Sequence, residues 1–177
     1  MQIIIPMTGY GSRFVAAGYG DLKPFIQVYN KPMIWWIVNG IFSKDDNFLF
    51  ICRKEHLDTI DNMENYLLNL APNVQIHAID NWEKKGPVFD VMKSFEYIQN
   101  DSPAIINYCD FYMTWDYDNF KKEVKNKNFD GAIPCYTNFH PNLIPEKNVY
   151  ASCRYDSNEI LLEIKEKFSF EKDKAKA

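Results

Sequence analysis

Short apolar runs rich in β-branched residues alternate with amphipathic stretches along most of this chain, and that alternation restricts its fold more than any other feature. Residues 3–5, 48–52, 74–79 and 103–108 have the composition of buried strands. Between them, residues 33–38, 57–70 and 87–98 place apolar side chains at helical spacing. Strands that alternate with helices usually form a mostly parallel sheet with helices on both faces. The sequence therefore predicts an α/β fold.

Some elements of this pattern are specific enough to test. Apolar residues spaced by three and four predict one amphipathic helix over residues 57–70. Pro87 opens a helix with a predicted inner stripe of Val88, Val91, Met92, Phe95 and Ile98. Asp118 is a candidate N-cap for a helix over 120–127, and further strands are predicted around 132–136, 149–153 and 160–164.

Composition excludes several classes of protein. With 177 residues, 46% of them hydrophobic, the chain fits one domain with a core and is not intrinsically disordered. A formal net charge of −4 argues against nucleic-acid binding. No apolar run is long enough to span a membrane and no signal peptide is evident, so we expect a cytoplasmic protein. Its four cysteines are predicted to be small buried side chains: Cys52, Cys109, Cys135 and Cys153.

Glycine is concentrated near the N-terminus. The chain has 7 glycines, and Gly9, Gly11, Gly18 and Gly20 fall within the first twenty residues. The segment P-M-T-G-Y-G-S-R-F at residues 6–14 directly follows the first strand, where backbone N–H groups can face phosphate oxygens and Arg13 adds a forked cation. It is neither a Walker A loop nor a G-x-G-x-x-G fingerprint. From the glycines alone, a purely structural turn is an equal alternative.

Two charged residues are placed to assist phosphate chemistry. Lys23 precedes Pro24 beyond the glycine-rich loop and is suited to neutralising a reacting phosphoryl group. Asp110 follows a predicted strand, at the sheet edge where α/β proteins bind ligands, and its carboxylate can coordinate Mg²⁺. Asp116 and Asp118 imitate a D-x-D metal motif, although capping is the preferred role for Asp118.

Together these segments resemble a known enzyme family. I-I-I-P-M-T-G-Y-G-S-R-F at residues 3–14, L-K-P-F-I-Q-V at 22–28 and K-P-M-I at 31–34 are similar to motifs of the nucleotidyltransferases that activate sugar phosphates and related phosphates with NTPs. Asn30 replaces the glycine of the last motif. The resemblance implies a Rossmann-like α/β/α sandwich of the nucleotide-diphospho-sugar transferase type.

The resemblance also implies the site. Arg13 and Lys23 would be catalytic, Asp110 would hold Mg²⁺, and E-K-F at residues 166–168 would place Glu166 and Lys167 at the acceptor phosphate. K-K-G-P at 84–87 lies where the family reads the base, with Lys85 in place of the usual glutamine. The implied nucleotide-binding residues are Met7, Thr8, Gly9, Gly11, Ser12, Arg13, Lys23, Lys85, Gly86 and Asp110.

A branch of the family is suggested by N-Y-C-D-F-Y-M, G-A-I-P-C-Y, K-N-V-Y-A-S-C and E-I-K-E-K-F. These segments are similar to the cytidylyltransferase that joins CTP to phosphorylated glutamine in bacterial capsule phosphoramidate synthesis. The implied reaction transfers CMP to a phosphorylated small molecule, with release of pyrophosphate. Residues 1–130 would then form an NTP-binding part and residues 131–177 the start of an acceptor-binding part of one domain.

Several alternatives stay open. They are a sugar-1-phosphate nucleotidyltransferase, a D-x-D glycosyltransferase and a non-catalytic nucleotide-binding module. An anionic acceptor needs no general base, so His56 and His77 are interpreted as structural, while His140 is a candidate acceptor contact. Family members usually continue beyond E-K-P, so the resemblance implies a fold truncated at its C-terminus, with Mg²⁺–NTP binding but poor turnover. Homo-oligomerisation is compatible with the sequence.

Overall fold

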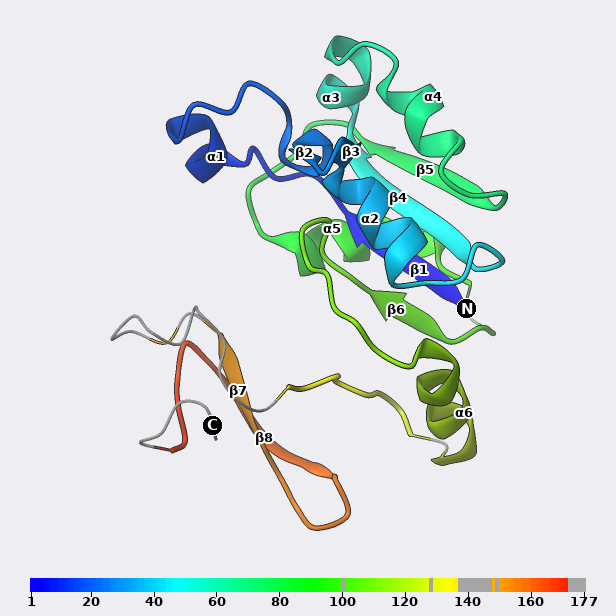
Figure 1. Ribbon diagram of the computed structural model, residues 1–177, viewed down its shortest axis with the longest axis vertical. Helices are drawn as coiled ribbons and strands as arrows, with labels where there is room; N and C mark the ends of the chain where they lie inside the picture. The colour runs from blue at the N-terminus through cyan, green and yellow to red at the C-terminus, as the bar shows by residue number, and fades with distance from the viewer. Residues whose placement is uncertain (100, 128, 137–147, 149, 172–177) are drawn as a thin grey trace. The chain divides into compact units, whose positions relative to one another are not determined.

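The computed structural model describes residues 1–99, 101–127, 129–136, 148 and 150–171 (Figure 1). These residues form two compact units, Met1–Lys121 and Lys122–Ala177, and each is described by itself. The predicted division into an NTP-binding part and an acceptor-binding part stays a prediction.

A four-stranded sheet organises the first unit (Figure 1). Its order is β5-β4-β1-β6, from β1 (Gln2–Pro6), β4 (Asn47–Arg53), β5 (Val74–Ile79) and β6 (Ala104–Ile106). All three strand pairs are parallel, with Ile4 opposite both Leu49 and Ile106. The carboxyl ends of all four strands therefore meet at one edge, called here the carboxyl edge. The opposite edge is the amino edge.

Strand alternation divides the core between the two faces of the sheet. Ile3 and Ile5 pack with Phe48 and Phe50 in a large cluster that includes α2 (Met33–Gly40) and α4 (Met63–Leu68). The intervening side chains point the other way, and they pack beneath α5 (Pro87–Lys93) in a smaller cluster: Ile4, Leu49 and Ile51 with Ile79 and Val91. The predicted α/β/α sandwich with a parallel sheet is confirmed.

Short elements complete the first unit. Helix α1 (Ser12–Ala16) and a 3₁₀ turn at Lys23–Phe25 follow β1. A small hairpin of β2 (Gln27–Val28) and β3 (Lys31–Pro32) turns through Tyr29 and Asn30, both with positive φ. Asparagine tolerates that conformation, which explains how Asn30 can stand where the resembled motif has glycine.

Two helix predictions were wrong. Residues 57–70 are not one helix, because Asn62 has a φ of 57° and separates α3 (Lys54–Thr59) from α4. Of the predicted stripe of α5, Val88, Met92 and Phe95 are exposed. Asp90 and Ser94 are buried in their place, since both make hydrogen bonds beneath the helix. Their polar contacts, rather than apolar periodicity, select the inward face.

The second unit is built on an antiparallel hairpin of β7 (Ala151–Tyr155) and β8 (Leu161–Glu166), near two of the predicted strands. The strand predicted around 132–136 is absent from the described residues of that segment. Cys52 and Cys109 are buried as predicted, and burial raises the pKa of both thiols to about 12. Cys135 is exposed, contrary to the prediction.

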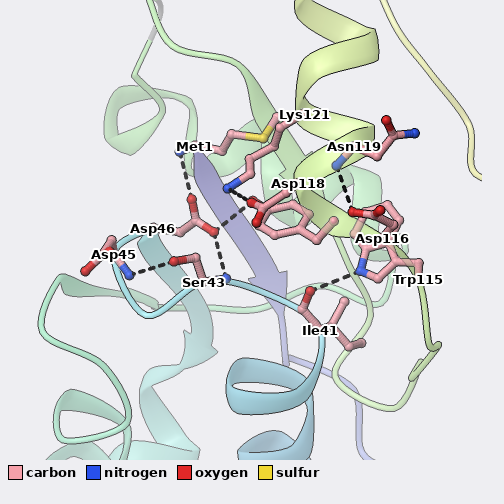
Figure 2. A network of polar contacts seen from close by, with 11 residues as sticks. Met1, Ile41, Ser43, Asp45, Asp46, Trp115, Asp116, Asp118, Asn119 and Lys121 are labelled. Carbon is pink, nitrogen blue, oxygen red and sulfur yellow. Dashed lines mark hydrogen bonds and ion pairs between the residues drawn. The ribbon is translucent and has the colours of Figure 1, made fainter.

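The amino edge of the sheet is closed by a polar network around Asp46 (Figure 2). Its carboxylate accepts hydrogen bonds from the Met1 ammonium at 2.9 Å, the Ser43 backbone N–H at 3.1 Å and the Tyr117 hydroxyl at 2.8 Å. Tyr117 begins α6 (Tyr117–Lys127). The pKa of its phenol is raised, mainly by burial and to a smaller extent by its hydrogen bond to Asp46. This network ties the start of β1 and the turn before β4 to α6.

No helix in the described part of the chain is long and apolar enough to cross a membrane.

Candidate active site at the carboxyl edge of the sheet

The glycine-rich loop continues directly from β1. Met7 stays in register, because its N–H donates to Ile51 O at 2.8 Å, and its side chain packs into the core. Thr8 is also buried, and its hydroxyl donates to the Asp90 carboxylate. The backbone then turns through Gly9, Tyr10 and Gly11 and enters α1. Met7 and Thr8 therefore anchor the loop, and their side chains are unavailable to a ligand.

Gly11 brings this loop against Lys23. Its φ of 62° favours glycine, and a Cβ at this position would lie 3.1 Å from Lys23 Cβ. The Lys23 ammonium in turn pairs with the Asp110 carboxylate, although the two residues are 87 positions apart in the sequence. Three residues predicted separately from sequence thus lie together at the carboxyl edge.

Two other predicted residues lie on the exposed helix α1. Ser12 is its first residue, and Arg13 follows with an exposed side chain. Phe14 shields the nearby lysine, since the Lys23 ammonium lies 5.5 Å from the centre of its ring. Arg13 is thus close in sequence to Gly11, with its guanidinium on the surface.

The predicted base-reading segment lies in the loop between β5 and α5. Gly86 is the N-cap of α5 and has a φ of 100°, so side chains at this position would be strained. The Lys85 ammonium pairs with Glu83 at 2.7 Å and lies over the Phe89 ring. The hydrogen bond from Lys85 lowers the pKa of the Glu83 carboxyl.

A buried network that the sequence did not reveal connects these loops. Asp90 accepts from the Thr8 hydroxyl and, at 3.0 Å, from Trp82 Nε1. Arg53, the last residue of β4, donates from Nε to Thr8 O. Asp90 is 1% exposed and Arg53 is 2% exposed. The glycine-rich loop, β4, the loop after β5 and α5 are therefore held by one set of hydrogen bonds.

The guanidinium of Arg53 is surrounded by aromatic rings. Its Cζ lies 3.4 Å from the centre of the Tyr10 ring and 3.8 Å from that of Trp82, and these rings meet at 86°. Nη1 lies 3.6 Å from Glu55, whereas Nη2 is buried with no hydrogen-bond partner among the described residues. These residues line a cavity of about 340 Å³ with Lys54, Asp58, Ile79, Asp80 and Asn81.

The remaining predicted residues lie elsewhere. Glu166 and Lys167 are in the second unit, where both are exposed and their charged groups lie 3.5 Å apart. Asp116 accepts from the Asn119 N–H and caps α6, the role predicted for Asp118, which pairs instead with Lys121. Both aspartates thus belong to the amino edge (Figure 2).

The histidines in the described part of the chain have structural surroundings. His77 Nδ1 lies 2.7 Å from the Ser94 hydroxyl, and its ring stacks on Tyr97. Burial lowers the pKa of His77, and burial together with the nearby Arg53 lowers that of His56. His140 lies outside the described residues.

The donor set at this edge suits magnesium bound together with phosphate. No cluster of three metal-ligating side chains occurs in the described ranges, which leaves no closed protein cage there. Mg²⁺ commonly binds through one or two carboxylates and completes its coordination with water and substrate phosphates. Asp110 supplies one partly exposed carboxylate beside Lys23 and the glycine-rich loop.

Comparison with known proteins rests on structure, since no protein-family model and no curated protein matches the sequence. A nucleoside-diphosphate-sugar pyrophosphorylase from Vibrio cholerae RC9 superposes on 96% of this chain and 68% of its own with a TM-score of 0.66 and 14% identity. The chain therefore shares the fold of that enzyme. UDP-glucose pyrophosphorylase complexed with UDP-glucose superposes on 94% of this chain and 68% of its own, with a TM-score of 0.65 and 15% identity. HddC from Yersinia pseudotuberculosis complexed with GMP-PN superposes on 94% of this chain and 69% of its own, with a TM-score of 0.62 and 17% identity.

Proposed function

We propose that this protein is a nucleotidyltransferase that transfers a nucleoside monophosphate from an NTP to a phosphorylated small molecule and releases pyrophosphate. The observation that supports this most directly is the meeting of Gly11, Lys23 and Asp110 at the carboxyl edge of a parallel sheet. Ligands of open α/β sheets bind at that edge. The shared fold with pyrophosphorylases is consistent with the same chemistry.

The proposed roles follow from charge and position. Backbone N–H groups of the glycine-rich loop and Arg13 would bind the outer phosphates, and Lys23 would stabilise negative charge at the α-phosphate. Lys85 and Gly86 would lie on the base side. Asp110 would hold Mg²⁺, which when bound neutralises phosphate charge. In the structure the Lys23 ammonium and the Asp110 carboxylate form an ion pair at the place where phosphate would enter.

Positioning accounts for the reaction without a general base. An acceptor phosphate oxygen attacks the α-phosphorus, the bond from that phosphorus to the bridging oxygen breaks, and pyrophosphate leaves with the electron pair. Glu166 and Lys167 are the proposed acceptor-binding residues. CTP is the favoured nucleotide and L-glutamine phosphate the favoured acceptor, on the resemblance to the capsule phosphoramidate branch. A sugar 1-phosphate is the second candidate, because a structural neighbour is named for UDP-glucose.

A pyrophosphate-release screen tests the proposal. Four NTPs are combined with phosphoglutamine, phosphocholine and sugar 1-phosphates in Mg²⁺, with enough protein to detect slow turnover. We expect release that depends on both substrates and is greatest for CTP with phosphoglutamine. Binding of an NTP without release for any acceptor would favour a non-catalytic nucleotide-binding module. In a parallel assay with sugar nucleotides in place of NTPs, release of a nucleoside diphosphate would favour a glycosyltransferase.

A further inference from the structure

The buried guanidinium of Arg53 has hydrogen-bonding capacity that the fold does not use. Arginine has five N–H donors and no acceptor. Nε donates to Thr8 O, and Nη1 lies 3.6 Å from Glu55, beyond ordinary hydrogen-bond distance. Nη2 is buried without a partner among the described residues. A buried donor without a partner is costly, so the end of this guanidinium is available for a ligand that restores the missing bonds.

The charges around the cavity favour a neutral group over a phosphate. Arg53 and Lys54 provide two positive charges, against three negative charges from Glu55, Asp58 and Asp80. Lys54 already pairs with Asp58 at 3.3 Å. A triphosphate would therefore meet an excess of carboxylates here, while a neutral aromatic base would not. Tyr10 and Trp82 add aromatic surfaces on which a base can stack.

The position of the cavity is also that of a base. Thr8 and Tyr10 belong to the loop proposed to bind phosphates, and Trp82 lies four residues before Gly86 in the proposed base-side loop. Arg53 contacts both loops, because it donates to Thr8 O and stacks on Trp82. A nucleotide with its phosphates near Gly11 thus has a cavity with aromatic walls beside the same loop.

We propose that Arg53 selects the base of the nucleotide by donating from the end of its guanidinium to the adjacent O2 and N3 acceptors of cytosine. This rests on the proposed function, which supplies CTP. Uracil has an N3–H donor between its two carbonyl oxygens, and this N–H would face an N–H of the Arg53 guanidinium. Adenine has no two neighbouring acceptors on its pairing edges, because the N6 amino group lies beside both N1 and N7. Arg53 therefore favours CTP over UTP and ATP.

Access to Nη2 requires a covering side chain to move. The Tyr10 ring lies over the guanidinium, is 54% exposed and stands between Gly9 and Gly11. A Cβ at Gly9 would meet no atom within 4 Å, so this part of the loop has room. In the proposed complex the Tyr10 ring swings from the guanidinium to stack on the incoming base.

The test measures binding of Mg²⁺ complexes of CTP, UTP, ATP and GTP to the full chain by calorimetry. Arg53→Lys keeps the charge but loses the planar pair of donors, and we expect it to weaken CTP binding by about 10- to 100-fold while UTP changes by less than about threefold. Arg154→Lys is the matched control, since Arg154 also lies over an aromatic ring, 4.6 Å from Phe170, and we expect unchanged CTP affinity.

A second measurement uses the unaltered protein. Replacing N3 of the base by CH, as in 3-deazacytidine triphosphate, removes one of the two acceptors and should weaken binding by about tenfold. This result does not depend on whether Arg53→Lys folds, which thermal melting reports separately.

The outcomes separate this proposal from the function on which it rests. Pyrophosphate release with an unchanged ratio of CTP to UTP affinity in Arg53→Lys would overturn the Arg53 assignment alone. A preference for GTP that Arg53→Lys abolishes would overturn cytosine as the base, since guanine O6 and N7 are also adjacent acceptors. Absence of binding for all four NTPs would overturn both proposals.

Discussion

The two edges of the sheet are each organised around a buried aspartate, and they differ in what is left unpaired. At the amino edge, Asp46 accepts from Met1, Ser43 and Tyr117, and its partner cation is the Met1 ammonium itself (Figure 2). At the carboxyl edge, Asp90 accepts from two neutral donors, Thr8 and Trp82. The nearby cation, Arg53, bonds to a backbone carbonyl instead and keeps Nη2 without a partner in the described chain.

That difference separates a structural network from one prepared for a ligand. A buried carboxylate paired with a cation and two further donors has its charge compensated within the fold. Arg53 is compensated only in part, by the Glu55 carboxylate at 3.6 Å, two aromatic rings and a backbone carbonyl. The carboxyl edge therefore keeps a partly compensated cation at Arg53 beside the Lys23–Asp110 ion pair, whereas the Asp46 carboxylate is compensated within its own network. Substitutions at the two edges should separate activity from stability.

The largest effect is expected for Lys23→Ala. Loss of this cation removes stabilisation of charge at the reacting phosphate, so pyrophosphate release should fall by about 100- to 1,000-fold. The side chain is not part of either aspartate network, and the thermal midpoint should change little. Lys44→Ala, at an exposed position next to the amino-edge turn, is the control and should retain full activity. Near-normal release by Lys23→Ala would contradict the proposed mechanism.

Asp90→Asn should damage both stability and nucleotide binding. The amide has one acceptor oxygen. If that oxygen keeps the bond from Trp82 Nε1, the NH₂ group faces Thr8, whose hydroxyl then accepts and loses the acceptor for its own hydrogen. We expect a loss of about 2–3 kcal/mol in the free energy of unfolding, measured in urea, because a buried donor then lacks its acceptor. Since Thr8 and Trp82 border the proposed nucleotide site, CTP binding should also weaken. Unchanged CTP affinity at full stability loss would show that Asp90 only supports the fold.

Asp46→Asn makes the same chemical change at the other edge. It removes the charge that balances the Met1 ammonium and one acceptor for Ser43 N–H and the Tyr117 hydroxyl. We expect a loss of about 1–2 kcal/mol in the free energy of unfolding. Binding of CTP by the folded protein should be unchanged, in contrast to Asp90→Asn. Equal loss of CTP affinity in both variants would remove the distinction between the two edges.

The alternation of strands and helices was sufficient to predict the parallel sheet, and the motif residues Gly11, Lys23 and Asp110 were predicted one by one before the fold brought them together. Arg53 and Asp90 were missed for a physical reason. Arg53 ends an apolar strand and Asp90 lies within an apolar helix segment, so local patterns assign neither a role. The burial of Asp90 is explained by its hydrogen bond from Thr8, 82 residues earlier, and a contact between such distant residues leaves no periodic pattern in the sequence. The exposed face of α5 was predicted as buried for the same reason.

Acidification should weaken the fold through two histidines, His56 in α3 and His77 in β5. Burial lowers the pKa of His56 and His77 in the folded protein below the ordinary value of about 6.5. Between that value and the lowered one, the unfolded chain binds more protons, so the free energy of unfolding falls as pH drops below about 6.5. His77→Gln should reduce this dependence while keeping a hydrogen bond to Ser94. A pH profile unchanged by His77→Gln would show that other groups determine it.

The smallest expected effect lies in the β2–β3 hairpin, which belongs to neither aspartate network and sets the baseline for both. Tyr29 has a φ of 48° and is 89% exposed, so its backbone conformation is unfavourable for an aromatic residue and its ring gains little from packing. Tyr29→Asn should raise the free energy of unfolding by about 0.5 kcal/mol, because asparagine adopts positive φ more readily. Tyr29→Val loses the same ring but is β-branched, and it should lower stability by a similar amount. Urea unfolding at constant m-value measures both, and equal stability of the two variants would show that the turn conformation contributes nothing.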